Sequence, residues 1–142
     1  MKRVGKKAIV FGIILALTLC FIWGNSMLSR EMSGAISHFV ADVFGGEQGA
    51  SEEGHFLEFA FLAVIFQLFA REVLKDGVRC ALASALVGVS VPLIDETIQI
   101  FSDRGYALTD VWIDISGYAL GSAVVLSAFL IVRFAQKRGK RE

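Results

Sequence analysis

The sequence predicts an all-α integral membrane protein: a four-helix bundle with an amphipathic helix in the outer loop between spans one and two. Three observations predict this fold. Hydrophobic residues make up 55% of the 142-residue chain. They are concentrated in four long runs, and the charged residues lie mostly between these runs. The runs show no alternation with a period of two, so each is expected to be a helix rather than a strand.

The predicted spans lie at about 8–25, 54–72, 78–98 and 110–133, and we expect them to form a single domain over 1–142. Each run is close to the roughly 17–25 residues that a helix needs to cross the hydrocarbon of a bilayer. The lipid bilayer is therefore the first predicted partner. The second run is the least typical of the four, because it carries His55 and Glu58.

The first run also resembles the apolar part of a signal peptide, since a basic segment precedes it. No small-x-small cleavage motif follows Trp23, and Leu19 stands before Cys20 where a lipoprotein site requires a small residue. We therefore expect an uncleaved anchor. Cys20 and Cys80 are expected in opposite halves of their spans, which excludes a disulfide between them.

The basic residues predict the orientation of the spans. They precede span one, separate spans two and three, and follow span four, while only Arg30 and Arg104 lie on the other side. By the positive-inside rule both termini and the middle loop are cytoplasmic. Trp23, Tyr106 and Trp112 then lie at the outer interface, where aromatic residues are enriched.

The long outer loop, residues 24–53, contains apolar residues at helical spacing. These are Met32, Ile36, Phe39, Val40, Val43 and Phe44. Because polar residues occupy the other faces, the pattern predicts a short amphipathic helix on the outer membrane surface or folded back onto the spans. Gly45 and Gly46 are expected to end it.

Two helix faces combine small residues with acids. In span three the stripe is Ala81, Ala85, Gly88, Pro92, Asp95 and Gln99, and in span four it is Asp110, Asp114, Gly117 and Gly121. Small residues four apart allow helices to approach closely. We therefore expect the two stripes to pack on each other or on span two, with their carboxylates meeting near the outer surface.

Span two adds His55 and Glu58, which share a helix face because they are three residues apart. Ionisable groups inside a membrane are costly and are functional candidates by default. The alternative is that the pair only fixes helix packing through hydrogen bonds. Arg104 has two interpretations as well. It could neutralise nearby acids, or its guanidinium could bind a phosphate or carboxylate group of a ligand. Asp95 and Glu96 could also form a solvated helix end.

Three motifs in order carry a resemblance to a known family. They are HFLEFA at 55–60, DETIQIFSDRG at 95–105 and TDVWIDISG at 109–117, followed by Gly121. Together they resemble the VanZ-like family of small bacterial membrane proteins over about residues 20–130. Ser102 and Asp103 stand where other members often have a proline and a glycine, which leaves the shape of this turn open.

The resemblance implies a multi-pass protein in the plasma membrane of a bacterium, and a role in the cell envelope. The founding member of the family is associated with low-level resistance to the glycopeptide antibiotic teicoplanin. The motif residues carried over to this chain are His55, Glu58, Asp95, Glu96, Gln99, Arg104, Asp110, Asp114 and Gly117.

Three classes of function follow from these observations. The first is an accessory protein that binds a cell-wall precursor, a lipid headgroup or the antibiotic in an outward-facing pocket. The second is an intramembrane hydrolase or transferase acting on a lipid-linked substrate, with His55 as general base, Glu58 or Asp114 as its orienting group and Arg104 stabilising developing charge. The third, a transporter, is disfavoured because the chain shows no inverted repeats.

No cofactor or metal site is predicted outright, because no spacing matches a metal signature such as H-E-x-x-H. A divalent metal held by His55, Glu58, Asp110 and Asp114 is a variant of the enzyme hypothesis. No nucleic-acid partner is expected either, since the basic residues form short flanks without interleaved aromatics.

Overall fold

The computed structural model describes residues 5–29, 31–32, 34–35, 51–102 and 104–139. Within these ranges the protein is all-α, as predicted. Its four long helices are α1 (Lys6–Ser26), α3 (Ser51–Leu74), α4 (Gly77–Phe101) and α5 (Leu108–Arg138). The helices therefore begin and end within a few residues of the predicted spans, and α5 continues five residues further at its C-terminal end.

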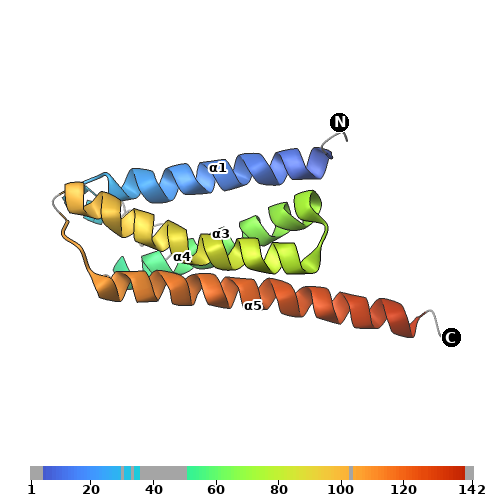
Figure 1. Cartoon of the computed structure of the whole chain (residues 1–142). Helices are drawn as coiled ribbons and strands as arrows, with labels where there is room; N and C mark the ends of the chain where they lie inside the picture. Colours follow the sequence, from blue (N-terminus) through green and yellow to red (C-terminus); the bar gives the residue numbers. More distant parts are fainter. Residues whose placement is uncertain (1–4, 30, 33, 36–50, 103, 140–142) are drawn as a thin grey trace.

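The helices run alternately in opposite directions along a common axis (Figure 1). Both chain ends and the α3–α4 turn lie at one end of the molecule. The other end, here called the polar end, is formed by the C-terminal ends of α1 and α4 and the N-terminal ends of α3 and α5. Helix α3 contacts each of the other three helices, and its interface with α5 is the most extensive.

Local signals in the sequence set the turns between the helices. Asp76 caps α4, since its carboxylate accepts a hydrogen bond of 2.8 Å from the backbone N–H of Arg79. Gly105 has a positive φ of 78°, a conformation that glycine adopts without steric cost, and it lies in the connection between α4 and α5. Pro92 lies inside α4 without ending the helix.

Within the described residues, three helices are long and apolar enough to cross a membrane: α1, α4 and α5. Their outward faces carry large apolar side chains, such as Leu17, Leu86 and Ile131, which are 65%, 69% and 68% exposed. Extended apolar surfaces of this kind are unfavourable in water and are suited to contact with lipid tails. The chain is therefore a multi-pass membrane protein.

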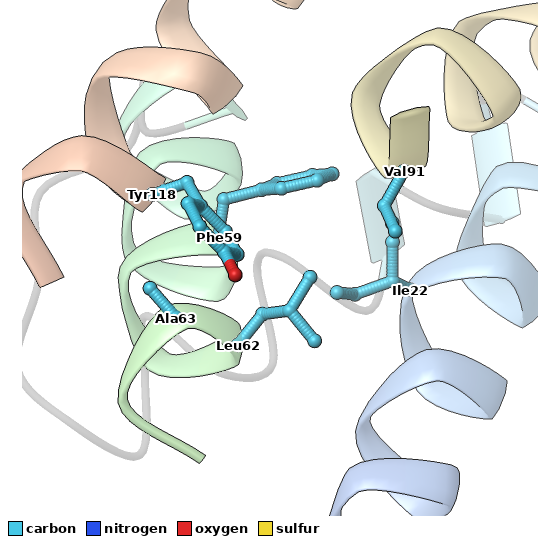
Figure 2. Packing of buried hydrophobic residues seen from close by; sticks show 6 residues of the cluster. All are labelled: Ile22, Phe59, Leu62, Ala63, Val91 and Tyr118. Atoms are coloured by element: carbon cyan, nitrogen blue, oxygen red, sulfur yellow. The ribbon is translucent and has the colours of Figure 1, made fainter. Parts of the chain in front are cut away.

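An apolar core joins all four helices (Figure 2). Phe59, Leu62 and Ala63 of α3 are fully buried and lie between Ile22 of α1, Val91 of α4 and Tyr118 of α5. Since α3 supplies half of this cluster, it is the central helix of the fold.

The small-residue stripe of α5 packs on α3, one of the two predicted arrangements. A Cβ atom on Gly117 would lie 2.2 Å from the carbonyl oxygen of Phe56, and one on Gly121 would lie 2.2 Å from that of Ala60. These separations are far below van der Waals contact, so the two backbones meet directly at positions that only glycine can fill.

The predicted stripe of α4 is correct near the polar end and wrong near the start of the helix. Asp95 and Gln99 are buried as predicted, but Ala81 and Ala85 are exposed, and Cys80 and Ser84 are buried in their place. Each step of four residues turns the side-chain direction by about 40°. A buried face that steps by four therefore winds around the helix, whereas the prediction assumed a straight stripe.

The predicted amphipathic helix falls mostly outside the described residues, which include only Met32 of its apolar face. The positions Ile36, Phe39, Val40, Val43 and Phe44 lie outside the described residues. Glu31 and Met32 are helical, as are residues 34–35.

Candidate functional site at the polar end

Asp95 of α4 is completely buried and is held through both of its oxygens. Ser26 at the end of α1 donates a hydrogen bond of 2.5 Å from Oγ to Oδ1 of Asp95. Gln99, one turn further along α4, donates from Nε2 to Oδ2 at 2.9 Å. These two bonds fix the orientation of the carboxylate, and they join α1 to α4 inside the membrane protein.

Asp114 of α5 is also completely buried, and it faces His55 of α3. His55 Nδ1 lies 3.3 Å from Asp114 Oδ1, an ion-pair distance when the imidazole is protonated. The other oxygen of Asp114, Oδ2, has no hydrogen-bond partner among the described residues. The contact with His55 is therefore the one that positions the Asp114 carboxylate within the described part of the chain.

The three side chains converge. One ligand-capable atom from each of His55, Asp95 and Asp114 lies within 4.8 Å of the others. The set is called the His–Asp centre below. It joins α3, α4 and α5, and Ser26 adds α1 through Asp95. Residues 88 positions apart at their extremes, Ser26 and Asp114, thus belong to one polar cluster.

Two half-buried charged groups lie beside the centre. Glu58, one turn after His55, interacts electrostatically with all three members of the centre. Arg104, in the turn before α5, attracts the carboxylates of Glu58 and Asp95, and its Nη1 donates a hydrogen bond of 3.4 Å to the carbonyl of Asn25. Both groups lie nearer the surface than Asp95 and Asp114.

Glu96 and Asp110 occupy different positions in the cluster. Glu96 is fully buried, and its Oε2 accepts a hydrogen bond of 2.9 Å from the backbone N–H of Ala107. This bond attaches α4 to the start of α5, so Glu96 has a structural task. Asp110 is half-buried, and its Oδ1 accepts a hydrogen bond of 3.3 Å from the hydroxyl of Thr109.

Sequence reasoning missed two residues of this cluster. Ser26 was assigned to the outer loop, although it lies on the same face of α1 as buried Ile22, one turn earlier. Ser102 was treated only as part of an unusual turn. Its hydroxyl donates 2.7 Å to the carbonyl of Ser26, which connects the ends of α1 and α4. The i, i+4 spacing from Ile22 was the available signal for Ser26.

A second polar group, also missed from the sequence, lies deeper between the helices. Gln67 Nε2 of α3 donates to Ser84 Oγ of α4 at 3.3 Å, and Ser84 Oγ lies 3.2 Å from the hydroxyl of Tyr118 of α5. This set of three is called the neutral chain below. It carries no ionisable acid or base that is charged at neutral pH.

In comparisons with known proteins, no family model, no curated protein and no solved structure matches this chain. The resemblance to the VanZ-like family therefore rests on the three sequence motifs. Each of these motifs includes residues of the two to three helical turns nearest the polar end, in α3, α4 and α5 respectively.

The arrangement has two chemical capacities. An imidazole next to a carboxylate can accept a proton while the carboxylate fixes its orientation. An imidazole with two carboxylates is also a ligand set for a divalent cation. Half-buried Glu58 and Arg104 would meet any molecule that reaches the centre from the membrane surface.

Proposed function

We propose that the chain is a VanZ-like protein of the bacterial cell envelope that binds the polar part of an envelope lipid or lipid-linked cell-wall precursor at its polar end. One observation carries this proposal. All four helices contribute polar or charged groups to a single cluster at the same end of the protein. Packing four apolar helices does not require such a cluster, and because charges within a membrane are costly, they are functional candidates by default.

In this proposal α3 is the fourth span of a four-helix bundle. Its 24 residues correspond to a length of about 36 Å at 1.5 Å per residue, which exceeds the roughly 30 Å of a hydrocarbon core. Its less apolar composition is tolerated because the other three helices surround it. His55 and Gln67 are buried within protein rather than presented to lipid.

The proposed orientation places the polar end outside the cytoplasm. Among the described residues, every Lys and Arg except Arg104 lies near the end that holds the termini and the α3–α4 turn. The positive-inside rule makes that end cytoplasmic. The polar end then faces the compartment in which cell-wall precursors are used and glycopeptide antibiotics act, and a role in teicoplanin resistance belongs to this proposal.

The chemistry of the ligand follows from the half-buried groups. The Arg104 guanidinium can hold a phosphate or carboxylate through two parallel hydrogen bonds. The carboxylates of Glu58 and Asp110 can accept hydrogen bonds from amines or sugar hydroxyls. A lipid whose phosphate carries an amine or sugar offers all of these partners together, with acyl or prenyl chains that remain in the bilayer.

Lipid binding to the full-length chain in nanodiscs tests the proposal, with a synthetic polyprenyl diphosphate and phosphatidylglycerol as probes. Arg104→Gln should weaken binding of the preferred probe roughly tenfold, because one charge-assisted interaction is lost. Arg79→Gln is the matched control, since Arg79 is an exposed arginine near the opposite end. Absence of saturable binding to either probe, or equal loss in both variants, would contradict the proposal.

A second candidate function is an intramembrane hydrolase or transferase on a lipid-linked substrate. The 3.3 Å approach of His55 to Asp114 favours it, because a carboxylate can orient a general base in this way. Mass spectrometry of envelope lipids and muropeptides distinguishes the two functions. A profile that changes between cells with wild type and His55→Ala supports the enzyme, and an unchanged profile supports binding alone.

A further inference from the structure

We infer that the His–Asp centre (His55, Asp95 and Asp114) binds one divalent transition-metal ion of the zinc type. The inference goes beyond the proposed function, because it concerns the buried interior of the cluster and requires no lipid. It also differs from the set considered from the sequence alone, since Asp95 replaces Glu58 and Asp110 as a ligand.

The geometry provides three ligand atoms from three helices. These atoms lie within 4.8 Å of one another. Zinc binds imidazole nitrogen and carboxylate oxygen at about 2.0–2.2 Å in tetrahedral geometry, so its ligand atoms lie about 3.4 Å apart. His55 Nδ1 and Asp114 Oδ1, at 3.3 Å, already have this separation. Completing the site requires the remaining ligand atom to approach by up to about 1.4 Å, through rotation of a carboxylate and a small shift of its helix. Catalytic zinc sites commonly have three protein ligands and leave one position open.

A separate observation points to a ligand that the protein itself does not supply. Asp114 is completely buried; its Oδ1 pairs with His55 Nδ1 at 3.3 Å, and its Oδ2 accepts no hydrogen bond from the described residues. Nearly all buried polar side-chain atoms in proteins have a hydrogen-bond partner, and a buried charge costs several kcal/mol unless it is paired or binds a metal. The unused oxygen of Asp114 is therefore available to a bound ion.

Charge and ligand type indicate the class of ion. Two aspartates and a neutral imidazole carry a formal charge of −2, which one divalent cation neutralises. An imidazole ligand favours zinc and neighbouring transition metals, whereas magnesium and calcium prefer oxygen ligands alone. The centre therefore favours an ion such as Zn²⁺ over Mg²⁺.

The surrounding hydrogen bonds match those that orient metal ligands. Ser26 and Gln99 donate to the two oxygens of Asp95 and hold its carboxylate in place toward the centre. Such outer partners raise metal affinity, and their removal typically reduces it 10- to 100-fold. Ser26 also brings α1 into the site, so ion binding would fasten all four helices together.

The competing explanation is a metal-free ion pair in which protonated His55 neutralises Asp114. One imidazolium balances only one of the two carboxylates of the centre, and Asp95 then depends on Arg104 and on its two hydrogen bonds. The two explanations differ in a directly measurable property, the binding of one metal equivalent.

The test uses the full-length chain, purified without a polyhistidine tag, stripped with chelator and titrated with Zn²⁺. Wild type should bind one equivalent. Asp114→Asn and Asp95→Asn should weaken binding at least 100-fold, and Ser26→Ala about tenfold. Glu31→Gln is the matched control, since Glu31 is an exposed acid just beyond α1 at the same end and outside the centre, and this variant should bind as wild type does. Co²⁺ in place of Zn²⁺ should give visible absorption bands that His55→Ala alters.

Circular dichroism and size-exclusion chromatography establish that each variant is folded, so that lost binding reports on the site. Failure of wild type to bind Zn²⁺ saturably, or equal affinity in Glu31→Gln and Asp114→Asn, would overturn the inference. Since lipid binding is measured with Arg104→Gln and metal binding with Asp114→Asn, either proposal can fail while the other stands.

Discussion

The neutral chain and the His–Asp centre are two polar groups that each join α3, α4 and α5, yet they are built differently. In the neutral chain, Gln67, Ser84 and Tyr118 contact one another at 3.2–3.3 Å, through groups that are uncharged at neutral pH. In the centre, one ligand atom from each of three ionisable side chains lies within 4.8 Å of the others, and Oδ2 of Asp114 accepts no hydrogen bond from the described residues.

This difference in charge and hydrogen bonding suggests different roles. The neutral chain holds helices together, and the His–Asp centre is available for a ligand. Hydrogen bonds between helices stabilise membrane proteins modestly and need no charge. Charged side chains with unused oxygens contribute less to packing than neutral ones and leave capacity for an ion or a substrate. If this comparison is correct, substitutions in the two regions should have opposite effects on stability and on binding.

The largest expected effect comes from the interface that positions both regions. Gly121→Ala places a Cβ about 2.2 Å from the Ala60 carbonyl, so α3 and α5 must separate. We expect the free energy of unfolding to fall by about 3 kcal/mol, measured by denaturation in mixed micelles. Gly24→Ala is the control, because a Cβ there meets no atom within 4 Å. Equal stability of the two variants would show that the close backbone approach is wrong.

The second-largest effect should be an increase in the free energy of unfolding, opposite to that of Gly121→Ala. Asp114→Asn removes a buried charge that lies close to Asp95 and is paired with His55. In metal-free protein we expect the free energy of unfolding to rise by about 2 kcal/mol, because the cost of burying the carboxylate and its repulsion from Asp95 disappear, and His55 can lose its proton so that no unpaired charge remains. The same micelle titration measures it. A decrease of similar size in the free energy of unfolding would show that Asp114 stabilises helix packing and would contradict this comparison.

Within the neutral chain the effect should be smaller and destabilising. Tyr118→Phe removes the hydroxyl next to Ser84 and keeps the ring that packs against Gly88. We expect a loss of about 1 kcal/mol, in the range measured for hydrogen bonds between membrane helices. Zn²⁺ affinity should stay at the wild-type value, and a marked change in it would show that the two regions are coupled.

The smallest effect is expected at Ser102, which connects the ends of α1 and α4 outside the centre. Ser102→Ala removes the 2.7 Å hydrogen bond to the Ser26 carbonyl. Because Ser102 is only partly buried, we expect a loss of about 0.5 kcal/mol in unfolding free energy. A loss above 2 kcal/mol would mean that this connection, rather than the core, determines how α1 is held.

The helices and their packing residues could be predicted where the signal is local. Runs of apolar residues located all four helices, and the spacing of Gly117 and Gly121 located the face of α5 that meets another helix. The choice of α3 as its partner was left open, because two glycines specify a close contact but not the helix that provides it. The straight stripe at Ala81 and Ala85 was wrong, because the path of the buried face depends on how α4 crosses its neighbours.

The site could be predicted in part for the same reason. His55, Asp95 and Asp114 were identified because charges within apolar runs are conspicuous. The sequence does not predict that these three form one group. It suggests Glu58 and Asp110 as metal ligands beside His55 and Asp114, and does not suggest Asp95. Ser26, Ser84 and Tyr118 are common residues whose importance comes only from what they contact across helices. The spacing of four residues from Ile22 is a signal for Ser26, but nothing in the immediate sequence of Ser84 and Tyr118 distinguishes them from serines and tyrosines that face lipid.

The central claim is that the His–Asp centre serves a ligand and the neutral chain serves packing. Unfolding with and without Zn²⁺ tests it most directly, with wild type, Asp114→Asn and Tyr118→Phe compared at a zinc concentration of 100 times the dissociation constant. We expect zinc to stabilise wild type and Tyr118→Phe by about 2.7 kcal/mol, and Asp114→Asn by no more than about 0.4 kcal/mol, because its dissociation constant should be at least 100-fold higher. No stabilisation of wild type, or the same stabilisation of Asp114→Asn, would contradict it.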